Sequence, residues 1–294
     1  MIRYYFLEAL EPTLLYGFVT GLLGLVVSLH YGGVHVFLGF LAIMGSVIVQ
    51  ASVNILDDYF DFEIGIDRET VKTKFSGGSK FIVNNNISPK AVLSMGLALV
   101  AIAFLIGAYL LSKTIIILPL MLFGGLSTLL YAKYLVRLPF MAEVITFLNF
   151  TFIAIGKFII TLNGIGFLIP ALFSFIPIGM SVGVAVIVNS VPDQVIDKKF
   201  GRKSGIVLFK NNKTRSKYYL VWQIAIIAIL SSGIVLNMLP YLFILVILAF
   251  IISSVHTYHG IRSYKTPIQY EKYMGFSNIA ILAASILMVI SYVV

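Results

Sequence analysis

Cysteine is absent from this 294-residue chain. Without thiols the protein has neither disulfide bonds nor thiolate ligands, so any metal ion must be held by oxygen or histidine. Charged residues are also scarce: they make up 11% of the sequence, whereas 60% is hydrophobic and the mean hydropathy is +1.01. A soluble globular domain carries about 25% charged residues. The composition therefore excludes a soluble globular domain and predicts an integral membrane protein.

The N-terminus lacks the features of a signal peptide. Glu8 and Glu11 interrupt the segment where a signal peptide has an apolar core, and no small-residue cleavage site follows. We therefore expect the segment to be retained and to lie at the membrane interface. The partners that we expect are the lipid bilayer and small molecules, with no nucleic acid.

Nine apolar runs follow one another, and most approach the roughly 20 residues that a helix needs to cross a bilayer. They lack the alternation of barrel strands, and backbone groups in lipid must be paired within the segment. The expected fold class is therefore all-α: residues 1–294 form a single polytopic membrane domain of nine transmembrane helices, arranged as two four-helix halves plus a ninth. The predicted spans are Leu14 to Leu29, Val36 to Leu56, Ala91 to Leu111, Ile115 to Tyr131, Phe140 to Leu162, Phe167 to Asn189, Tyr218 to Leu236, Tyr241 to Val255 and Tyr273 to Val293.

Lysine and arginine are distributed unevenly among the loops. All 21 of them except Lys113 and Lys157 precede the first span or lie in the loops after spans two, four, six and eight. The positive-inside rule places these loops and the N-terminus in the cytoplasm and the C-terminus outside, in a multi-pass protein of the cell membrane. The two long connections, residues 57–90 and 190–217, are then both cytoplasmic.

Each of these long connections carries an acidic cluster that directly follows an apolar run. The clusters are Asn54, Asp57, Asp58 and Asp61, and Asn189, Asp193 and Asp197. Positions three or four apart share one face of a helix, so each cluster forms a wall of oxygen ligands. Mg²⁺ prefers oxygen and is usually bound by one or two carboxylates plus substrate phosphates. Two such walls, each followed by lysines and arginines, predict a site for Mg²⁺ and a diphosphate.

Two other interpretations account for acids at these positions. Interfacial acids often pair with neighbouring lysines and arginines, because charge at the boundary costs less than charge at the bilayer centre. A cation-coupled transporter also carries carboxylates in its membrane segments, although it more naturally holds them near the midplane in broken helices. Two matched clusters beside cations suited to phosphate favour the diphosphate site.

The clusters resemble the two signatures of the UbiA superfamily of intramembrane prenyltransferases. The first signature runs from Asn54 through Asp57-Asp58-Tyr59-Phe60-Asp61 to Gly65, Asp67 and Ser76-Gly77-Gly78-Ser79. The second runs from Asn189 through Asp193 and Asp197 to Gly201-Arg202-Lys203-Ser204. The resemblance implies a helical bundle around a cavity that opens to the cytoplasm and binds a polyprenyl diphosphate through Mg²⁺.

The same resemblance implies roles for individual residues. The metal ligands would be Asn54, Asp58, Asp61, Asn189, Asp193 and Asp197, with the four aspartates as the catalytic residues. The diphosphate would be bound by Lys72, Lys74, Lys198, Arg202 and Lys203. Candidate acceptor-site residues are Tyr131, Lys133, Glu143 and Lys157. Lys157 is the one lysine or arginine inside a predicted span, and it either meets an acceptor carboxylate or snorkels outward.

The reaction implied is Mg²⁺-dependent transfer of a polyprenyl group to an aromatic quinone precursor. Tyr59 and Gly77-Gly78 resemble the branch that prenylates 1,4-dihydroxy-2-naphthoate in menaquinone biosynthesis, whereas Glu11-Pro12 stands where that branch often has an arginine before the proline. The alternative acceptors are 4-hydroxybenzoate, a homogentisate-like ring, haem and an archaeal glycerol phosphate lipid.

Overall fold

The computed structural model describes residues 13–294, and all regular secondary structure in that range is helical. The interfacial position expected for the N-terminus, and the Glu11-Pro12 pair, lie outside the described residues. The α-helices are α2 (Thr13–His30), α3 (Val36–Ile64), α4 (Ile66–Glu69), α5 (Pro89–Leu111), α6 (Leu118–Leu130), α7 (Met141–Leu162), α8 (Leu168–Lys199), α9 (Gly205–Leu208), α10 (Asn212–Val235), α11 (Phe243–Arg262) and α12 (Pro267–Ser291). Two 3-10 turns, η1 (Ile115–Ile117) and η2 (Leu135–Arg137), precede α6 and α7.

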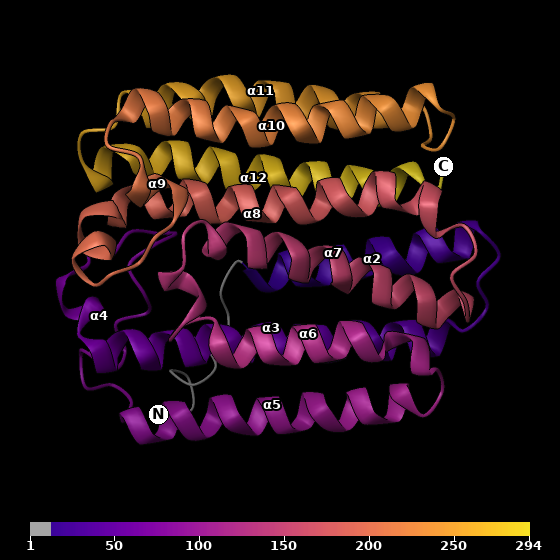
Figure 1. Cartoon of the computed structure of the whole chain (residues 1–294), viewed down its shortest axis with the longest axis horizontal. Coiled ribbons are helices and arrows are strands. Elements are labelled where there is room, and N and C mark those ends of the chain that lie inside the picture. Colours follow the sequence, from indigo (N-terminus) through magenta and orange to yellow (C-terminus); the bar gives the residue numbers. More distant parts are fainter. Residues whose placement is uncertain (1–12) are drawn as a thin grey trace.

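The long helices lie side by side with their axes close to one direction (Figure 1). Within the described range, 8 helices are long and apolar enough to cross a membrane: α2, α3, α5, α7, α8, α10, α11 and α12. The fourth predicted span is instead a shorter apolar segment, Ile115–Leu130, which begins with η1. The prediction of an all-α protein with several membrane helices is therefore confirmed.

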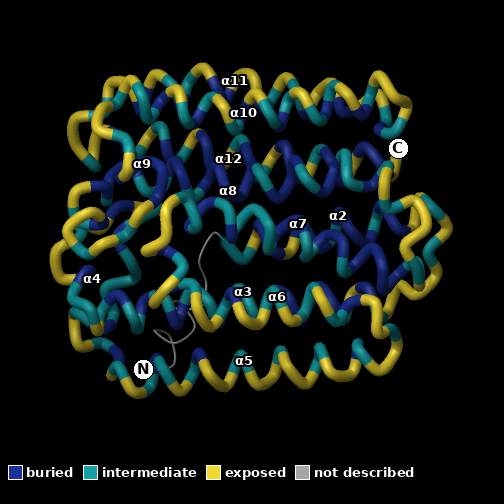
Figure 2. Tube along the Cα trace, in the orientation of Figure 1, coloured by how far each residue is buried: buried dark blue, intermediate teal, exposed yellow. Residues whose placement is uncertain are grey.

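The helix at the centre of the bundle is α8 (Figure 2). In its apolar 18-residue stretch 72% of the residues are buried, compared with 17% in the corresponding stretch of α5. Glycines allow neighbouring helices to approach closely. A β-carbon at Gly179 of α8 would collide with the carbonyl oxygen of Phe147 on α7, and one at Gly24 of α2 would collide with that of Ala154. Small residues at such contacts are typical of helix packing in membranes, because close backbone approach maximises van der Waals contact.

Two helices continue beyond the boundaries that hydropathy predicts. α3 runs to Ile64 and stops at Gly65, which has a left-handed conformation (φ 87°), and α8 runs to Lys199. Both acidic clusters therefore lie on helical extensions, whereas the expected connections began at residues 57 and 190. The polar residues do not end the helices because they face the interior of the protein; Asp58 and Asp61 are each 7% exposed and Asp197 is 6% exposed.

At the opposite end of the bundle, the turn between α2 and α3 is attached to the last turn of α7. The backbone N–H groups of Val34 and His35 both donate to the carbonyl oxygen of Thr161, at 3.2 and 3.1 Å. The start of α3 and the end of α7 therefore lie at the same level, and the two helices run in opposite directions.

Candidate active site

A cavity of about 970 Å³ lies among α3, α5, α6, α7 and α8. The walls at one end carry the acidic clusters, and the rest is largely apolar. All six residues that were expected to organise metal ions line this cavity: Asn54, Asp58, Asp61, Asn189, Asp193 and Asp197. The fold thus joins two clusters that are separated by more than a hundred residues of sequence.

Arg202, in the turn after α8, lies between the two clusters. Its Nη2 donates to Asp61 Oδ1 and is 3.6 Å from Asp57 Oδ1, while its Nη1 is 3.7 Å from Asp197 Oδ1. Burial opposes the charge of Arg202, but these carboxylates outweigh that effect and raise its pKa above the usual value. The site therefore holds a permanent cation with a fork-shaped set of donors, which suits phosphate.

The loop after α4 folds over the first cluster. The Ser79 N–H donates to Asp58 Oδ2 at 3.2 Å, and Lys80 Nζ donates to the backbone oxygen of Asp67. Gly78 has a φ of +65°, and a β-carbon there would collide with the Asp67 carboxylate, so glycine is required. Burial and the charge of Asp58 raise the pKa of Asp67 to about 7.

Both asparagines are held by other helices. Asn54 Nδ2 donates to Thr13 Oγ1 of α2 at 2.8 Å, and Asn189 Oδ1 accepts from Asn278 Nδ2 of α12 at 3.0 Å. Tyr16 of α2 donates to Asn278 Oδ1 at 2.9 Å, which fixes the orientation of that amide. The sequence reasoning missed Asn278, although its isolation in an apolar run was a usable signal.

The donor set fits Mg²⁺, since it consists of carboxylate and amide oxygens. Over residues 13–294, however, no group of three or more His, Asp or Glu side chains is placed to hold a metal ion by itself. Three of the carboxylates face Arg202 instead. The arrangement is suited to a metal ion that receives part of its coordination from substrate phosphates.

The expected diphosphate ligands fall into two groups. Lys72 and Lys74 line the cavity with Arg202, and Lys72 Nζ donates to the backbone oxygen of Gly78. Lys198 and Lys203 are exposed and do not line it. Lys203 contributes its backbone: its N–H donates to Val136 O, and its carbonyl oxygen accepts from the N–H of residue 140, both at 2.9 Å.

The four candidate acceptor-site residues are also dispersed. Tyr131 lines the cavity at the end that carries the aspartates, whereas Lys133 lies outside it, with its Nζ 5.4 Å from the ring centre of Tyr134. Glu143 does not line the cavity and is fully buried among other side chains. Its carboxylate accepts hydrogen bonds from Gly205 N–H at 2.7 Å and from Tyr218 Oη at 2.6 Å. Lys157 lines the cavity but on the last turns of α7, far from the clusters.

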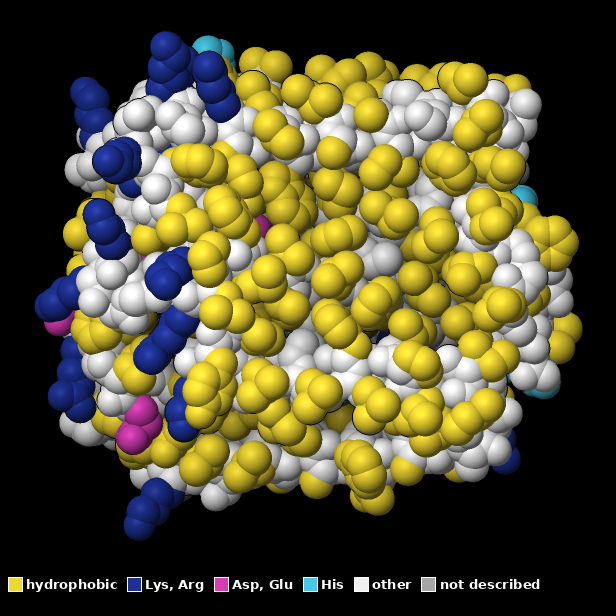
Figure 3. Space-filling model, viewed as in Figure 1, with side chains coloured by type: hydrophobic (Ala, Val, Ile, Leu, Met, Phe, Trp, Pro, Cys, Tyr) yellow, Lys and Arg dark blue, Asp and Glu magenta, His cyan; other side chains and the backbone are white. Residues whose placement is uncertain are grey.

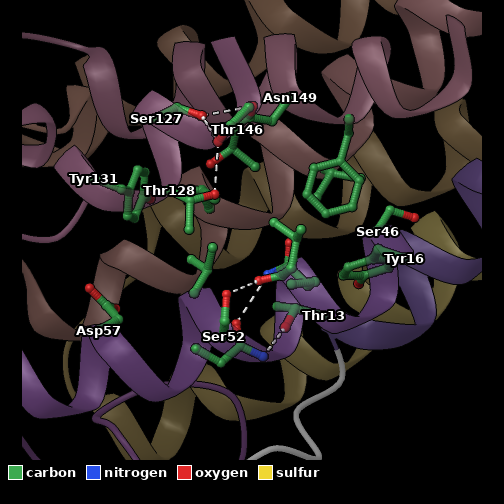
Figure 4. A pocket seen from close by; sticks show the side chains of 18 of the residues that line it. Thr13, Tyr16, Ser46, Ser52, Asp57, Ser127, Thr128, Tyr131, Thr146 and Asn149 are labelled. Carbon is green, nitrogen blue, oxygen red and sulfur yellow. Dashed lines mark hydrogen bonds between the residues drawn. The ribbon is translucent and has the colours of Figure 1, made fainter. Parts of the chain in front are cut away.

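The sequence reasoning missed a second polar wall in the cavity. Ser127 and Thr128 of α6 lie beside Thr146 and Asn149 of α7, on the wall across from Asp57 (Figure 4). Ser127 Oγ donates to Asn149 Oδ1 at 2.9 Å. Polar residues at helical spacing within apolar runs were the signal for this wall.

The comparisons with known proteins agree with this architecture. A family model described as "UbiA prenyltransferase family" matches residues 14–289. The chain belongs to this family. This UbiA protein is accordingly a prenyltransferase, and the resemblance inferred from its two signatures is confirmed.

One relative of this UbiA protein is the 1,4-dihydroxy-2-naphthoate octaprenyltransferase of Bacillus subtilis (strain 168). It is 30% identical over 240 residues, which cover 79% of this chain and 74% of the relative. A structure of digeranylgeranylglyceryl phosphate synthase aligns with a TM-score of 0.66 at 15% identity, covering 99% of this chain and 98% of the other. A UbiA homologue from Archaeoglobus fulgidus, bound to DMAPP and Mg²⁺, aligns with a TM-score of 0.63 at 14% identity, covering 93% and 96%.

Proposed function

We propose that this protein transfers a polyprenyl group from an allylic polyprenyl diphosphate to 1,4-dihydroxy-2-naphthoate in menaquinone biosynthesis, with Mg²⁺ as cofactor. The observation that carries the proposal is the cavity itself: two acid-bearing helix ends and Arg202 meet at one end of a space that is otherwise largely apolar. The 30% identity to a naphthoate octaprenyltransferase supports this acceptor, and the Mg²⁺ in a homologous structure supports the metal.

In this proposal the acidic end of the cavity binds the diphosphate. Asn54, Asp58, Asp61, Asn189, Asp193 and Asp197 would hold Mg²⁺, which neutralises phosphate oxygens when bound. Arg202 donates two parallel hydrogen bonds to the same group, while Lys72 and Lys74 add positive charge at the rim. These cations stabilise the negative charge that grows on the diphosphate as the allylic C–O bond breaks.

The acceptor ring lies between the diphosphate and the second polar wall in this scheme. The C–O electron pair leaves with the diphosphate, and the ring supplies the electron pair for the new C–C bond. The attacked ring carbon then loses its hydrogen as a proton, or its carboxyl group as carbon dioxide. In this scheme Thr146, Asn149 and Tyr131, which line the cavity, bind the ring hydroxyls, and the apolar walls exclude water from the allylic cation.

We also propose a topology of nine spans in two four-helix halves plus a ninth, with Ile115–Leu130 as the fourth and with the cavity open to the cytoplasm. Lysine and arginine gather at the end of the molecule where α4 and α9 lie, next to the acidic end of the cavity (Figure 3). The positive-inside rule favours a cytoplasmic position for that end.

The test is mass spectrometry of the products that purified protein forms from a panel of aromatic acceptors and prenyl diphosphates. We expect prenylated naphthoate and free diphosphate with Mg²⁺, and neither after chelation. Product from 4-hydroxybenzoate, a homogentisate-like ring, haem or a glycerol phosphate lipid, with none from the naphthoate, would reassign the acceptor. Solute movement across proteoliposomes without diphosphate release would instead favour a cation-coupled transporter.

A further inference from the structure

Lys157 lies at the end of the cavity opposite to the aspartates. It is one turn before Thr161, whose carbonyl oxygen accepts from the backbone at the start of α3. With a rise of about 1.5 Å per residue, Asp57 is about 32 Å along α3 from Val36, while Lys157 is only about 6 Å from Thr161. The α-carbons of Lys157 and Asp57 are therefore separated by on the order of 25 Å along the bundle axis.

The surroundings of Lys157 are apolar. The lysine is 7% exposed and lines the cavity, and its side chain has no hydrogen-bond or ion-pair partner among residues 13–294. The apolar residues that line the cavity include Ile160 on the next turn of α7 and, on other elements, Ala42 of α3, Leu110 of α5 and Ile117 of η1. The charged form of the Lys157 amine is therefore costly, because no acceptor of the protein satisfies its donors.

The separation argues against contact between Lys157 and the acceptor carboxylate. The acceptor ring must touch the allylic carbon, which is bonded to the diphosphate at the acidic end. Lys157 instead lies several isoprene units away from that carbon, at the level that the end of an extended prenyl tail would reach.

We propose that Lys157 is a specificity-determining residue that limits the length of prenyl chain held within the cavity. A tail that stops short of it contacts only apolar walls. A tail that reaches it surrounds the unpaired polar amine with hydrocarbon, which weakens binding. The inference rests on the proposed function, because it assumes that the diphosphate binds at the acidic end.

The test compares Lys157→Met with wild type over a series of prenyl diphosphates that increase by one isoprene unit. Methionine has a similar length to lysine but no charge. In this variant kcat/KM for chains that reach residue 157, divided by kcat/KM for short chains, should therefore rise at least about tenfold, which is equivalent to about 1.4 kcal/mol. Values for short chains should stay within about twofold of wild type. The matched control is Lys113→Met, which removes an exposed lysine that does not line the cavity and should leave the length profile unchanged. An unchanged profile in Lys157→Met, or an equal loss at all lengths, would overturn the proposal.

Binding provides a readout that does not need an acceptor. The thermal stabilisation of each variant by non-hydrolysable prenyl diphosphates reports affinity for each length. A shifted binding profile without naphthoate product would support the role of Lys157 and reject the proposed acceptor. Prenylated naphthoate from short chains, together with an unchanged binding profile, would support the proposed acceptor and reject the role of Lys157.

A second measurement uses only the wild-type protein, in case Lys157→Met does not fold. A prenyl diphosphate with a photoreactive group at its far end should label the α7 segment around Lys157 when its chain is long enough, and not when it is shorter. Labelling confined to lipid or to other helices at every length would show that the tail leaves the cavity by another route, which would overturn the inference.

Discussion

Arg202 shows at the scale of a single residue why the acidic clusters tolerate one another. Carboxylates of Asp57, Asp61 and Asp197 from two helices converge on one guanidinium group. Burying so many negative charges without a cation would cost several kcal/mol. The same cation is available to a diphosphate, so binding of substrate would exchange one set of oxygen partners for another.

Replacing Arg202 should therefore impair the reaction more than replacing the nearby surface lysine, Lys199. We expect Arg202→Gln to lower kcat/KM about 100-fold or more, because an electrostatic donor to the leaving group is lost. Arg202→Lys should retain only part of the wild-type kcat/KM, because lysine keeps the charge but lacks the planar pair of donors of a guanidinium group. The control is Lys199→Gln, since Lys199 pairs with Glu69 on the surface, 2.6 Å apart and largely exposed. Equal effects of Arg202→Gln and Lys199→Gln would contradict the assignment.

The aspartates of the two walls allow a separate test. We expect Asp58→Ala or Asp193→Ala to abolish prenyl transfer while the protein remains folded, since each removes an oxygen ligand from one wall. Transfer is measured in detergent with Mg²⁺ and radiolabelled prenyl diphosphate. Glu63→Ala is the matched control, because Glu63 is exposed and lies outside the cavity. Full activity of either aspartate variant would disprove the metal-wall assignment.

At the scale of elements, the turn that carries Arg202 is held by a contact between α7 and the segment after α8. Glu143 of α7 accepts hydrogen bonds from the N–H of Gly205 and from the hydroxyl of Tyr218. The backbone of Lys203 pairs with Val136 in η2. These contacts hold the turn that carries Arg202 against the bundle, so we expect Glu143 to act on the site by holding this turn in place.

Removal of the Glu143 carboxylate should loosen this turn. We expect Glu143→Ala to lower the apparent Tm in detergent by several degrees, because the buried donors of Gly205 and Tyr218 lose their acceptor at about 1–3 kcal/mol each. Glu143→Gln keeps a carbonyl acceptor and should lose less. An apparent Tm of Glu143→Ala equal to that of the wild type would show that the contact of Glu143 with Gly205 and Tyr218 does not stabilise the protein.

At the scale of the whole molecule, charge and hydrophobicity divide the surface into two regions. Apolar side chains cover most of the face seen in Figure 3, while lysine and arginine concentrate at one end. The aspartates are hidden from that surface because they line the cavity. The molecule therefore presents hydrocarbon to lipid and keeps the aspartates of the two clusters in an internal site.

The proposed orientation can be measured directly, because the chain has no cysteine of its own. We expect Lys210→Cys to react with a membrane-impermeant maleimide only after the cytoplasmic side is opened, and Lys113→Cys to react in intact cells, as the positive-inside rule requires. Both lysines are exposed. The opposite pattern would place the acidic end of the cavity outside the cell.

The class of the protein follows from its amino-acid sequence alone, and the sequence also predicts the chemistry of its site. Long apolar runs can only be buried in lipid as helices, and oxygen ligands at helical spacing beside cations predict a site for metal and phosphate. The signatures also identified the family, because they are local in sequence.

Which side chains meet could not be predicted from the sequence, because it depends on how the helices pack. Hydropathy placed the helix ends too early, since it records where lipid ends and not where the polar turns pack against protein. Glu143 and Lys157 belong to one helix, yet one supports the turn before α9 and the other lines the far end of the cavity. Such roles depend on the level and the face at which neighbouring helices pack, and close contacts such as Gly24 against Ala154 set that packing only once the chain is folded.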